Sequence, residues 1–425
     1  MTTDVQTSVP APQTPPTPRG GRGAMGSIVA AYVARLRGGD VGSLPALLGL
    51  VALVIVFSAL RPHTFTNAFN FANLIGQSAG VTVLAMGLVF VLLLGEIDLS
   101  AGYTGGTAAA VLGVVLTRHG WPLVPSLVCC LLTGAVIGAV IGLLVARLGI
   151  PSFVVTLAAF LGLQGVLLTV IGEGGTIPFQ NDFVNKLNNG SLPVWLGWVL
   201  GIIGIAAYAA TTYLSDHRRR AKGLTVQPVL QWALKAATVA VVVLAVVGYL
   251  SIERSRHPAV NSLKGVPISL LVIVILLVVL MFALNKTAWG RHVYAVGGNA
   301  EAARRAGINV ARIRLSCFMV SSTVAAIAGL LIASRTNSVN PTTGGSTTLL
   351  YAVGAAVIGG TSLFGGKGRI VDAVIGGTVV AVIDNGMALL NQPQGTVWMV
   401  TGLVLLVAAS VDALSRRRAS ATGSV

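Results

Sequence analysis

The chain has 425 residues, of which 54% are hydrophobic and 9% are charged, and its net charge is +16. An ordinary soluble domain has about 25% charged residues, so this composition excludes a soluble fold. Continuous apolar runs of about 20 residues recur along the chain, each long enough to cross the hydrocarbon core of a bilayer as a helix. The runs do not alternate between apolar and polar residues, which excludes a membrane β-barrel. We therefore predict an all-α fold, a polytopic bundle of transmembrane helices.

Residues 1–43 are rich in Pro, Thr and Gly and predict a disordered N-terminal tail. The membrane domain is expected over residues 44–414, followed by a short basic tail at 415–425. The expected spans are 44–60, 74–94, 98–117, 123–147, 152–172, 193–214, 229–250, 266–285, 314–334, 346–364, 369–391 and 395–414. The third and tenth are rich in Gly and Thr, so the expected number is about 12, with a range of 10–12.

Basic residues are distributed unevenly between the two sides of these spans. Of the 28 Lys and Arg, 20 lie on the side of the N-terminus, 7 lie on the other side, and Lys235 lies within a span. Cytoplasmic segments carry the excess of Lys and Arg, so both termini are expected in the cytoplasm. The positive charge is thus an orientation signal and does not indicate a nucleic-acid partner.

Two carboxylates, Glu96 and Asp98, lie in the break between the second and third spans, and Ser100 follows them. An ionisable residue inside a membrane is costly and marks a functional site. These residues can bind a polar solute, gate a pore or cap the next helix, because Asp98 and Ser100 are both good N-cap residues. We place all three in or beside the translocation pathway, with helix capping as the alternative.

Other polar side chains interrupt apolar runs further along. Gln164 is a lone polar residue in the fifth span, and Asp384 and Asn385 break the eleventh. They either pair with a neighbouring helix, or gate or line a water-filled pathway. Asn73 and Gln77, at the start of the second span, are expected to face an outer vestibule.

The longest basic segment on the cytoplasmic side, residues 286–313, predicts a short helix of about two turns. Asn299 suits its N-cap, Glu301 its positive end and Gly307 its stop. We interpret the helix, flanked by glycines expected to be flexible, as a docking site for a soluble partner, with an ordinary solvated loop as the alternative. The docking residues are Gly297, Gly298, Asn299, Glu301, Ala302, Arg304, Arg305 and Gly307.

The chain lacks a phosphate-binding loop of its own. In the nearest candidate, Gly359–Gly368, Thr361 stands where the motif needs its first Gly, five positions before Gly366, and Gly368 replaces the required Ser or Thr. No nucleophile–base pair is recognisable and the five His are scattered, so we predict no catalytic residue, metal site or cofactor in this chain.

Six motifs together resemble the monosaccharide permeases of bacterial ATP-binding-cassette importers, and most closely their xylose-type branch. The motifs are Glu96–Ser100, Pro151–Leu157, Gly290–Asn299, Glu301–Arg304 with Gly307–Val310, Val357–Leu363 and Asp384–Met387. As in the xylose-type branch, the region 175–265 holds two extra spans, and Glu96 stands where ribose-type members usually have Gly.

The resemblance implies a multi-pass protein of the bacterial inner membrane that imports a monosaccharide, with xylose favoured. It implies a permease dimer, formed by two copies or two such chains, surrounded by lipid. It also implies an extracytoplasmic sugar-binding protein and an ATPase subunit that docks on Gly297–Gly307 and uses the ATP. The alternatives are ribose, galactose or another small polar solute and, from a different class, a secondary transporter that works alone.

Overall fold

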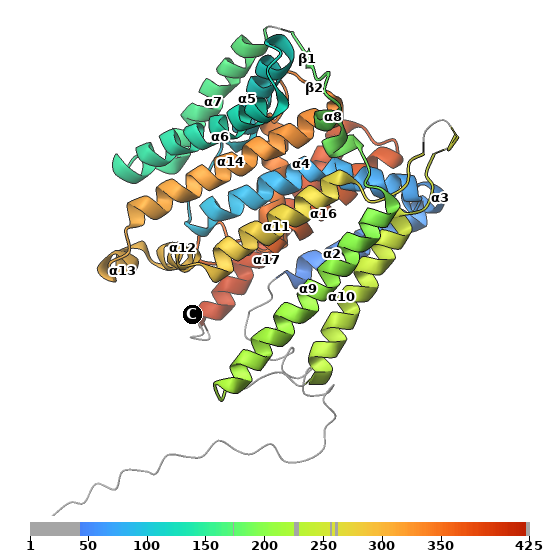
Figure 1. The fold of residues 1–425 in the computed structure, drawn as a ribbon. Coiled ribbons are helices and arrows are strands. Elements are labelled where there is room, and N and C mark those ends of the chain that lie inside the picture. The colour runs from blue at the N-terminus through green and yellow to red at the C-terminus, as the bar shows by residue number, and fades with distance from the viewer. Residues whose placement is uncertain (1–42, 173, 225–228, 256, 260–261, 422–425) are drawn as a thin grey trace, which may run out of the picture. The chain divides into compact units, whose positions relative to one another are not determined.

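A computed structural model describes residues 43–172, 174–224, 229–255, 257–259 and 262–421, and it describes side chains as far as residue 410. The predicted N-terminal tail lies outside the described residues except for Ser43, and so does the C-terminal tail from residue 422. The described chain is mostly helical, which confirms the predicted all-α class (Figure 1).

Eight of the described helices are long and apolar enough to cross a membrane. They are α4 (Ala68–Leu93), α6 (Leu123–Arg147), α7 (Ser152–Ile171), α9 (Val194–Ala221), α10 (Val229–Leu250), α11 (Ile268–Lys286), α14 (Val310–Thr336) and α16 (Ile370–Leu389). The shorter apolar helices are α2 (Leu44–Leu60), α15 (Ser346–Gly359) and residues 394–410 of α17 (Gln394–Ala421). Helix α5 (Ala101–Gly113) continues into a π-helical turn, η1 (Val114–Arg118).

The remaining elements are small. They are α3 (Pro62–Phe65), β1 (Ile177–Pro178), α8 (Asp182–Asn189), α12 (Ala288–Gly298), α13 (Ala300–Arg305) and β2 (Ser338–Val339). The two strands pair antiparallel, with Ile177 opposite Val339. Each of the twelve predicted spans contains a helix, but α5 and α15 are short, so the count of twelve stays a prediction.

Local sequence sets where the two central helices begin and end. Asn67 precedes α4, and its side chain accepts a hydrogen bond from the backbone N–H of Phe69 at 2.8 Å. Asn309 caps α14 in the same way through the N–H of Arg312, at 3.0 Å. At the other end of α14, Asn337 adopts a left-handed conformation (φ 52°) that stops the helix.

Residues 42–413 form one compact unit. At its centre α4 packs against α14, while α16 packs on α4 and α6 packs on α14 (Figure 1). The short helices also pack on this central pair: α5 lies on α14, and α15 lies on α4. Helix α6 carries a ridge of glycines at every fourth residue, Gly134, Gly138 and Gly142, which lets it pack closely on α14. A Cβ at Gly134 or Gly138 would lie 2.5 Å from a backbone oxygen of α14.

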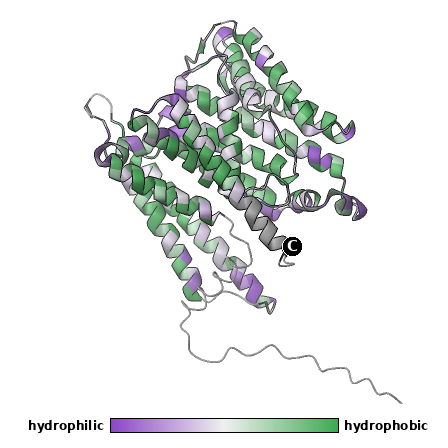
Figure 2. Cartoon of the chain, turned by 180° about the vertical axis from the view of Figure 1, so that it is seen from behind, coloured by the Kyte–Doolittle hydropathy of each residue, from purple (hydrophilic) through white to green (hydrophobic). Residues whose placement is uncertain are grey.

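Helices α9 and α10 form a hairpin that packs mainly on itself. Both carry many exposed large apolar side chains, including Trp195, Ile202, Val241 and Val242. Figure 2 shows apolar residues along the lengths of the helices and hydrophilic residues at helix ends and connecting segments. This distribution matches helices that meet lipid along their sides and water at their ends.

Candidate functional site

The six predicted pathway residues separate into two groups at opposite ends of α4, with Gln164 in neither. Glu96, Asp98 and Ser100 follow the C-terminus of α4, whereas Asp384 and Asn385 contact residues near its N-terminus. The 26 residues of α4 span about 39 Å at 1.5 Å per residue. One site cannot contain both groups.

The group that follows α4 is held by an ion pair and a tight turn. Glu96 lies 3.2 Å from Arg314 near the start of α14, and these two side chains are 14% and 31% exposed. Asp98 is 1% exposed, and its Oδ1 accepts hydrogen bonds from the backbone N–H of Ser100 at 2.9 Å and from the Ser100 hydroxyl at 2.6 Å. These bonds organise the turn that enters α5. Ser100 is the N-cap residue of α5, and among the described residues no side chain makes a capping hydrogen bond there.

The same end of α4 contacts the segment predicted to dock a partner. A Cβ at Gly297 would lie 1.9 Å from the backbone oxygen of Leu93, so α12 meets α4 at a point where only glycine fits. The N–H of Gly366 donates to that same oxygen at 2.8 Å. Gly297 and Gly298 are the last residues of α12, and the backbone of α4 packs directly against Gly297. The flexibility of the flanking glycines stays a prediction.

Tyr294 also ties α12 to the segment between α15 and α16. Its hydroxyl donates to the backbone oxygen of Gly368 at 2.8 Å, and burial raises the pKa of the Tyr294 phenol above its ordinary value. The phenol therefore keeps its proton at neutral pH, and the hydrogen bond persists.

The predicted short helix is confirmed as α13. The Asn299 side chain accepts from the N–H of Ala302 at 2.9 Å, and Gly307 follows the helix with a φ of +83°. Glu301 lies 2.9 Å from Arg304 and 3.4 Å from Arg305, and all three side chains are exposed. Exposed ion pairs of this kind contribute at most about 1 kcal/mol, so these charges are accessible to a partner without being essential to the fold. The docking role stays a prediction.

At the other end of α4, six side chains from α4, α14 and α16 meet in what we call the polar cluster. Its members are Asn70, Asn73, Gln77, Arg335, Asp384 and Asn385. The amides of Asn70 and Asn385 bond reciprocally, each at 2.9 Å. Gln77 donates to Asp384 at 2.7 Å, and Arg335 donates to Asn73 at 3.1 Å.

This geometry supports the helix-pairing interpretation of Asp384 and Asn385. Polar side chains between membrane helices are favourable when they bond one another, because lipid offers no alternative partner. Asn73 also lines a cavity, as the predicted vestibule requires, whereas Gln77 faces Asp384. Contact of these residues with a transported solute stays a prediction.

Gln164 is half-buried on α7, which packs on α5 and α6. The structure gives it no hydrogen bond within the described residues and no contact with the polar cluster. Its predicted place in the pathway is untested.

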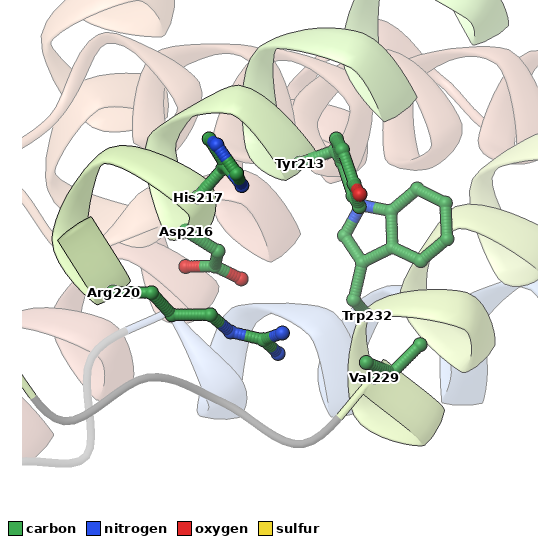
Figure 3. A pocket seen from close by; sticks show the side chains of 6 residues that line it. All are labelled: Tyr213, Asp216, His217, Arg220, Val229 and Trp232. Atoms are coloured by element: carbon green, nitrogen blue, oxygen red, sulfur yellow. The ribbon is translucent and has the colours of Figure 1, made fainter.

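A small pocket lies between α9 and α10 and is shown in Figure 3. Tyr213 and Trp232 face each other there, with ring centroids 5.5 Å apart, and Asp216, His217 and Arg220 lie beside them (Figure 3). Its volume of about 20 Å³ is close to the minimum for one water molecule. This pocket is too small for a sugar.

Sequence reasoning missed three contributors to these contacts: Asn70, Arg314 and Arg335. Arg314 counted only toward the orientation signal, and Asn70 and Arg335 lie at the margins of predicted spans. Arg314 and Arg335 could have been found, because each lies at an end of the apolar run 314–334. A charged residue at such a place usually pairs with another group of the protein. Among the residues that the structure describes, no group of three or more His, Cys, Asp or Glu could hold a metal ion.

The apolar helices, together with the similarities below, define a multi-pass membrane permease. The chain belongs to the family described as branched-chain amino acid transport system / permease component, whose model matches residues 70–409. It is 35% identical over 369 residues to the xylose transport system permease protein of Escherichia coli K12, covering 87% of this chain and 91% of that protein.

Two further relatives are similar over comparable lengths. The xylose transport system permease protein of Haemophilus influenzae is 32% identical, covering 88% of this chain and 96% of that protein. The ribose import permease protein of E. coli K12 is 29% identical, covering 86% of this chain and 92% of that protein. No solved structure matches the chain.

Proposed function

We propose that this chain is the membrane-spanning subunit of an ATP-driven importer that carries a monosaccharide, and that the sugar is xylose. The observation that carries the proposal is the 35% identity to a xylose permease over 87% of this chain. Ribose is the second candidate, because the ribose permease is 29% identical over a comparable length. The motifs that distinguish the xylose-type branch, the additional α9–α10 hairpin and Glu96, favour xylose.

We further propose that residues 44–414 form the permease domain, with about 12 spans and both termini in the cytoplasm of a bacterium. The distribution of 20 and 7 basic residues supports this orientation. It places the C-terminal end of α4, α12 and α13 inside and the polar cluster outside. Segment 286–313 is then the cytoplasmic docking loop.

An ATPase subunit docks on Gly297–Gly307 and carries out all ATP chemistry, so this chain needs no cofactor. The exposed charges of α13 and the close packing of α12 on α4 support this assignment. A sugar-binding protein delivers the solute to the opposite side. The permease forms a homodimer within the lipid, and nucleic acid is not a partner.

In this proposal α4 connects the docking segment at one end of the permease with the polar cluster at the other end. Docking acts on Leu93 through Gly297 and on Glu96 through Arg314, while Asn70 and Gln77 at the far end hold α16. ATP binding and hydrolysis shift the permease between outward-open and inward-open states, because the partners bind the two states with different affinities. Glu96, Asp98, Ser100, Gln164, Asp384 and Asn385 lie in or beside the pathway or control its opening.

The docking assignment is tested with the double variant Glu301→Ala/Arg304→Ala, purified with its candidate ATPase and reconstituted with the binding protein. We expect the ATPase to stop co-purifying and ATP-dependent xylose uptake to be lost. The matched control is Asp182→Ala/Lys186→Ala, which removes an exposed pair of the same kind in α8. Normal co-purification and uptake in the Glu301 variant would reject the docking site.

A further inference from the structure

A polar cavity of about 200 Å³ lies beside the polar cluster, where the start of α4, the end of α8 and the end of α14 meet Arg254, Leu263 and Pro267. It is roughly ten times larger than the pocket between α9 and α10. The lining residues that matter here are Phe69, Asn73, Asn188, Asn189, Ser191 and Arg335.

Asn188 carries a hydrogen-bonding atom with no partner. The residue is 6% exposed, and its Nδ2 donates to the backbone oxygens of Gly76 and Leu331, each at 3.0 Å. Its Oδ1 is buried and has no hydrogen-bond partner among the described residues. This oxygen has almost no accessible surface, so it lies behind the cavity lining, and Asn188 holds the wall through its Nδ2 bonds instead of meeting a ligand itself.

The neighbouring side chains offer further free groups of both kinds. Arg335 donates to Oδ1 of Asn73, and the Nδ2 of Asn73 has no partner within the described residues. Asn189 donates through Nδ2 to the backbone oxygen of Ser334, and within the same described part its Oδ1 accepts nothing. A free amide donor and a free amide acceptor therefore line the same cavity.

The chemistry of this lining selects a class of ligand. A hydroxyl both donates and accepts, so a molecule with several hydroxyls suits mixed amide groups. Phe69 is 55% exposed and adds an aromatic face for the apolar side of a sugar ring. The residues that line the cavity include no carboxylate, which disfavours a cation.

The two arginines at the cavity do not make it an anion site. The Arg254 guanidinium donates to backbone oxygens of Leu250 and Gly265 and to the Ser191 hydroxyl. Arg335 interacts electrostatically with Asp384. Both guanidinium groups are thus engaged within the protein, and the free groups of Asn73 and Asn189 are uncharged amides, which suit a neutral ligand.

We propose that this cavity is a binding subsite for a neutral monosaccharide on the permease itself, a proposal that rests on the proposed import function. In it Asn73, Asn189 and Arg335 bond the hydroxyls and Phe69 packs on the ring. The subsite lies at the end of α4 away from the docking segment, where an imported sugar arrives first. The permease then holds the sugar briefly between release by the binding protein and passage through the membrane.

The test is equilibrium binding of radiolabelled xylose to the permease–ATPase complex in nanodiscs, without the binding protein. We expect saturable binding that weakens about tenfold in Asn73→Ala, as loss of roughly one hydrogen bond predicts, and also weakens in Phe69→Ala. Gln392→Ala, an exposed polar residue outside the cavity, is the matched control and should bind like the native chain.

Three outcomes decide the matter. Binding that Asn73→Ala and Phe69→Ala leave unchanged, while the full system still imports xylose with ATP, would overturn the subsite and leave the proposed function intact. Failure of the full system to import any monosaccharide would overturn both. Binding of the anion xylonate about tenfold tighter than xylose would reject the neutral class of ligand.

Discussion

Helices α4 and α9 are about equally apolar, but α4 is buried within the protein and α9 is largely exposed on its surface. The mean hydropathy of their apolar stretches is 1.9 and 1.8, yet 83% of that stretch is buried in α4 and 6% in α9. Each helix contains three glycines, so the difference lies in what packs against them and in the amide side chains of α4. Helix α4 carries small residues such as Gly80 and Gly87 at its contacts with α14, whereas α9 presents large side chains such as Trp195 and Ile202.

This comparison shows that hydropathy finds membrane helices, while close backbone contacts and amide side chains distinguish the helix at the centre. Without a hydrophobic force between helices in lipid, close backbone packing and hydrogen bonds hold the bundle together. Helix α4 has both, including Asn70 and Gln77 of the polar cluster. The α9–α10 hairpin has few such contacts with the rest of the chain.

The largest contrast is expected between matched glycine substitutions in the two regions. A Cβ at Gly329 of α14 would lie 2.0 Å from the backbone oxygen of Gly105, whereas nothing lies within 4 Å at Gly204 of α9. We expect Gly329→Ala to destabilise the fold by about 3 kcal/mol and Gly204→Ala to be neutral or stabilising by up to about 1 kcal/mol. Thermal unfolding in detergent measures both, and equal shifts would contradict the contrast.

The ion pair at the end of α4 should give the next largest effect. Reversing one charge with Glu96→Arg places two cations together in a half-buried site, so we expect a loss of about 2 kcal/mol in stability and impaired uptake. The exchanged pair Glu96→Arg/Arg314→Glu should recover more than half of both losses. If the exchange recovers neither, the pairing has no role.

A double-mutant cycle on Asn70→Ala and Asn385→Ala measures the coupling energy between two amides of the polar cluster. Hydrogen bonds between membrane helices average about 0.6 kcal/mol and reach about 1.7 kcal/mol, so a coupling energy near 1 kcal/mol is expected for this reciprocal pair. Unfolding of the four proteins in detergent supplies the numbers. Additive effects of the two substitutions would show that the amides do not bond in the folded protein.

The smallest effect concerns Glu253, the neighbour of Arg254 at the cavity. Glu253 accepts from the Ser262 hydroxyl at 2.5 Å, from the N–H of Ser255 at 3.0 Å and from the N–H of Leu263 at 2.8 Å, which lowers its pKa from 4.5 to about 2. Because the folded pKa is the lower one, the stabilisation is complete above pH 4.5 and declines as the pH falls toward about 2.

In the Glu253→Gln variant, the amide hydrogens of Ser255 and Leu263 should therefore exchange with solvent several times faster than in the native chain at pH 6. The two proteins should become alike as the pH approaches about 2, where the native carboxylate takes up a proton. Hydrogen exchange read by mass spectrometry follows these amides. Equal protection at pH 6 would count against the assignment.

The sequence predicted the elements whose signals are local. Apolar runs located the helices, and Asn299, Glu301 and Gly307 located α13 with its cap and stop. The contacts between distant segments could not be predicted. Glu96 meets Arg314, and Asn70 meets Asn385 across 315 positions of sequence, so no short motif records either pair.

Glycine function was equally hard to assign from the sequence alone. Gly297 looked like a flexible link, but its role depends on Leu93, which lies in another helix. The cavity depends on Asn188 and Arg335, which come together only when α8 folds against α14. Spacing within one helix does predict packing, as the ridge of Gly134, Gly138 and Gly142 demonstrates.

The most direct measurement is uptake of labelled xylose, ribose and fructose by proteoliposomes that contain this chain, its candidate ATPase and its sugar-binding protein. One set receives ATP inside the vesicles, and a matched set receives an imposed proton or sodium gradient without ATP. We expect xylose to accumulate only with ATP and only when all three proteins are present. Accumulation driven by the ion gradient in vesicles that hold this chain alone would contradict the importer and identify a secondary transporter.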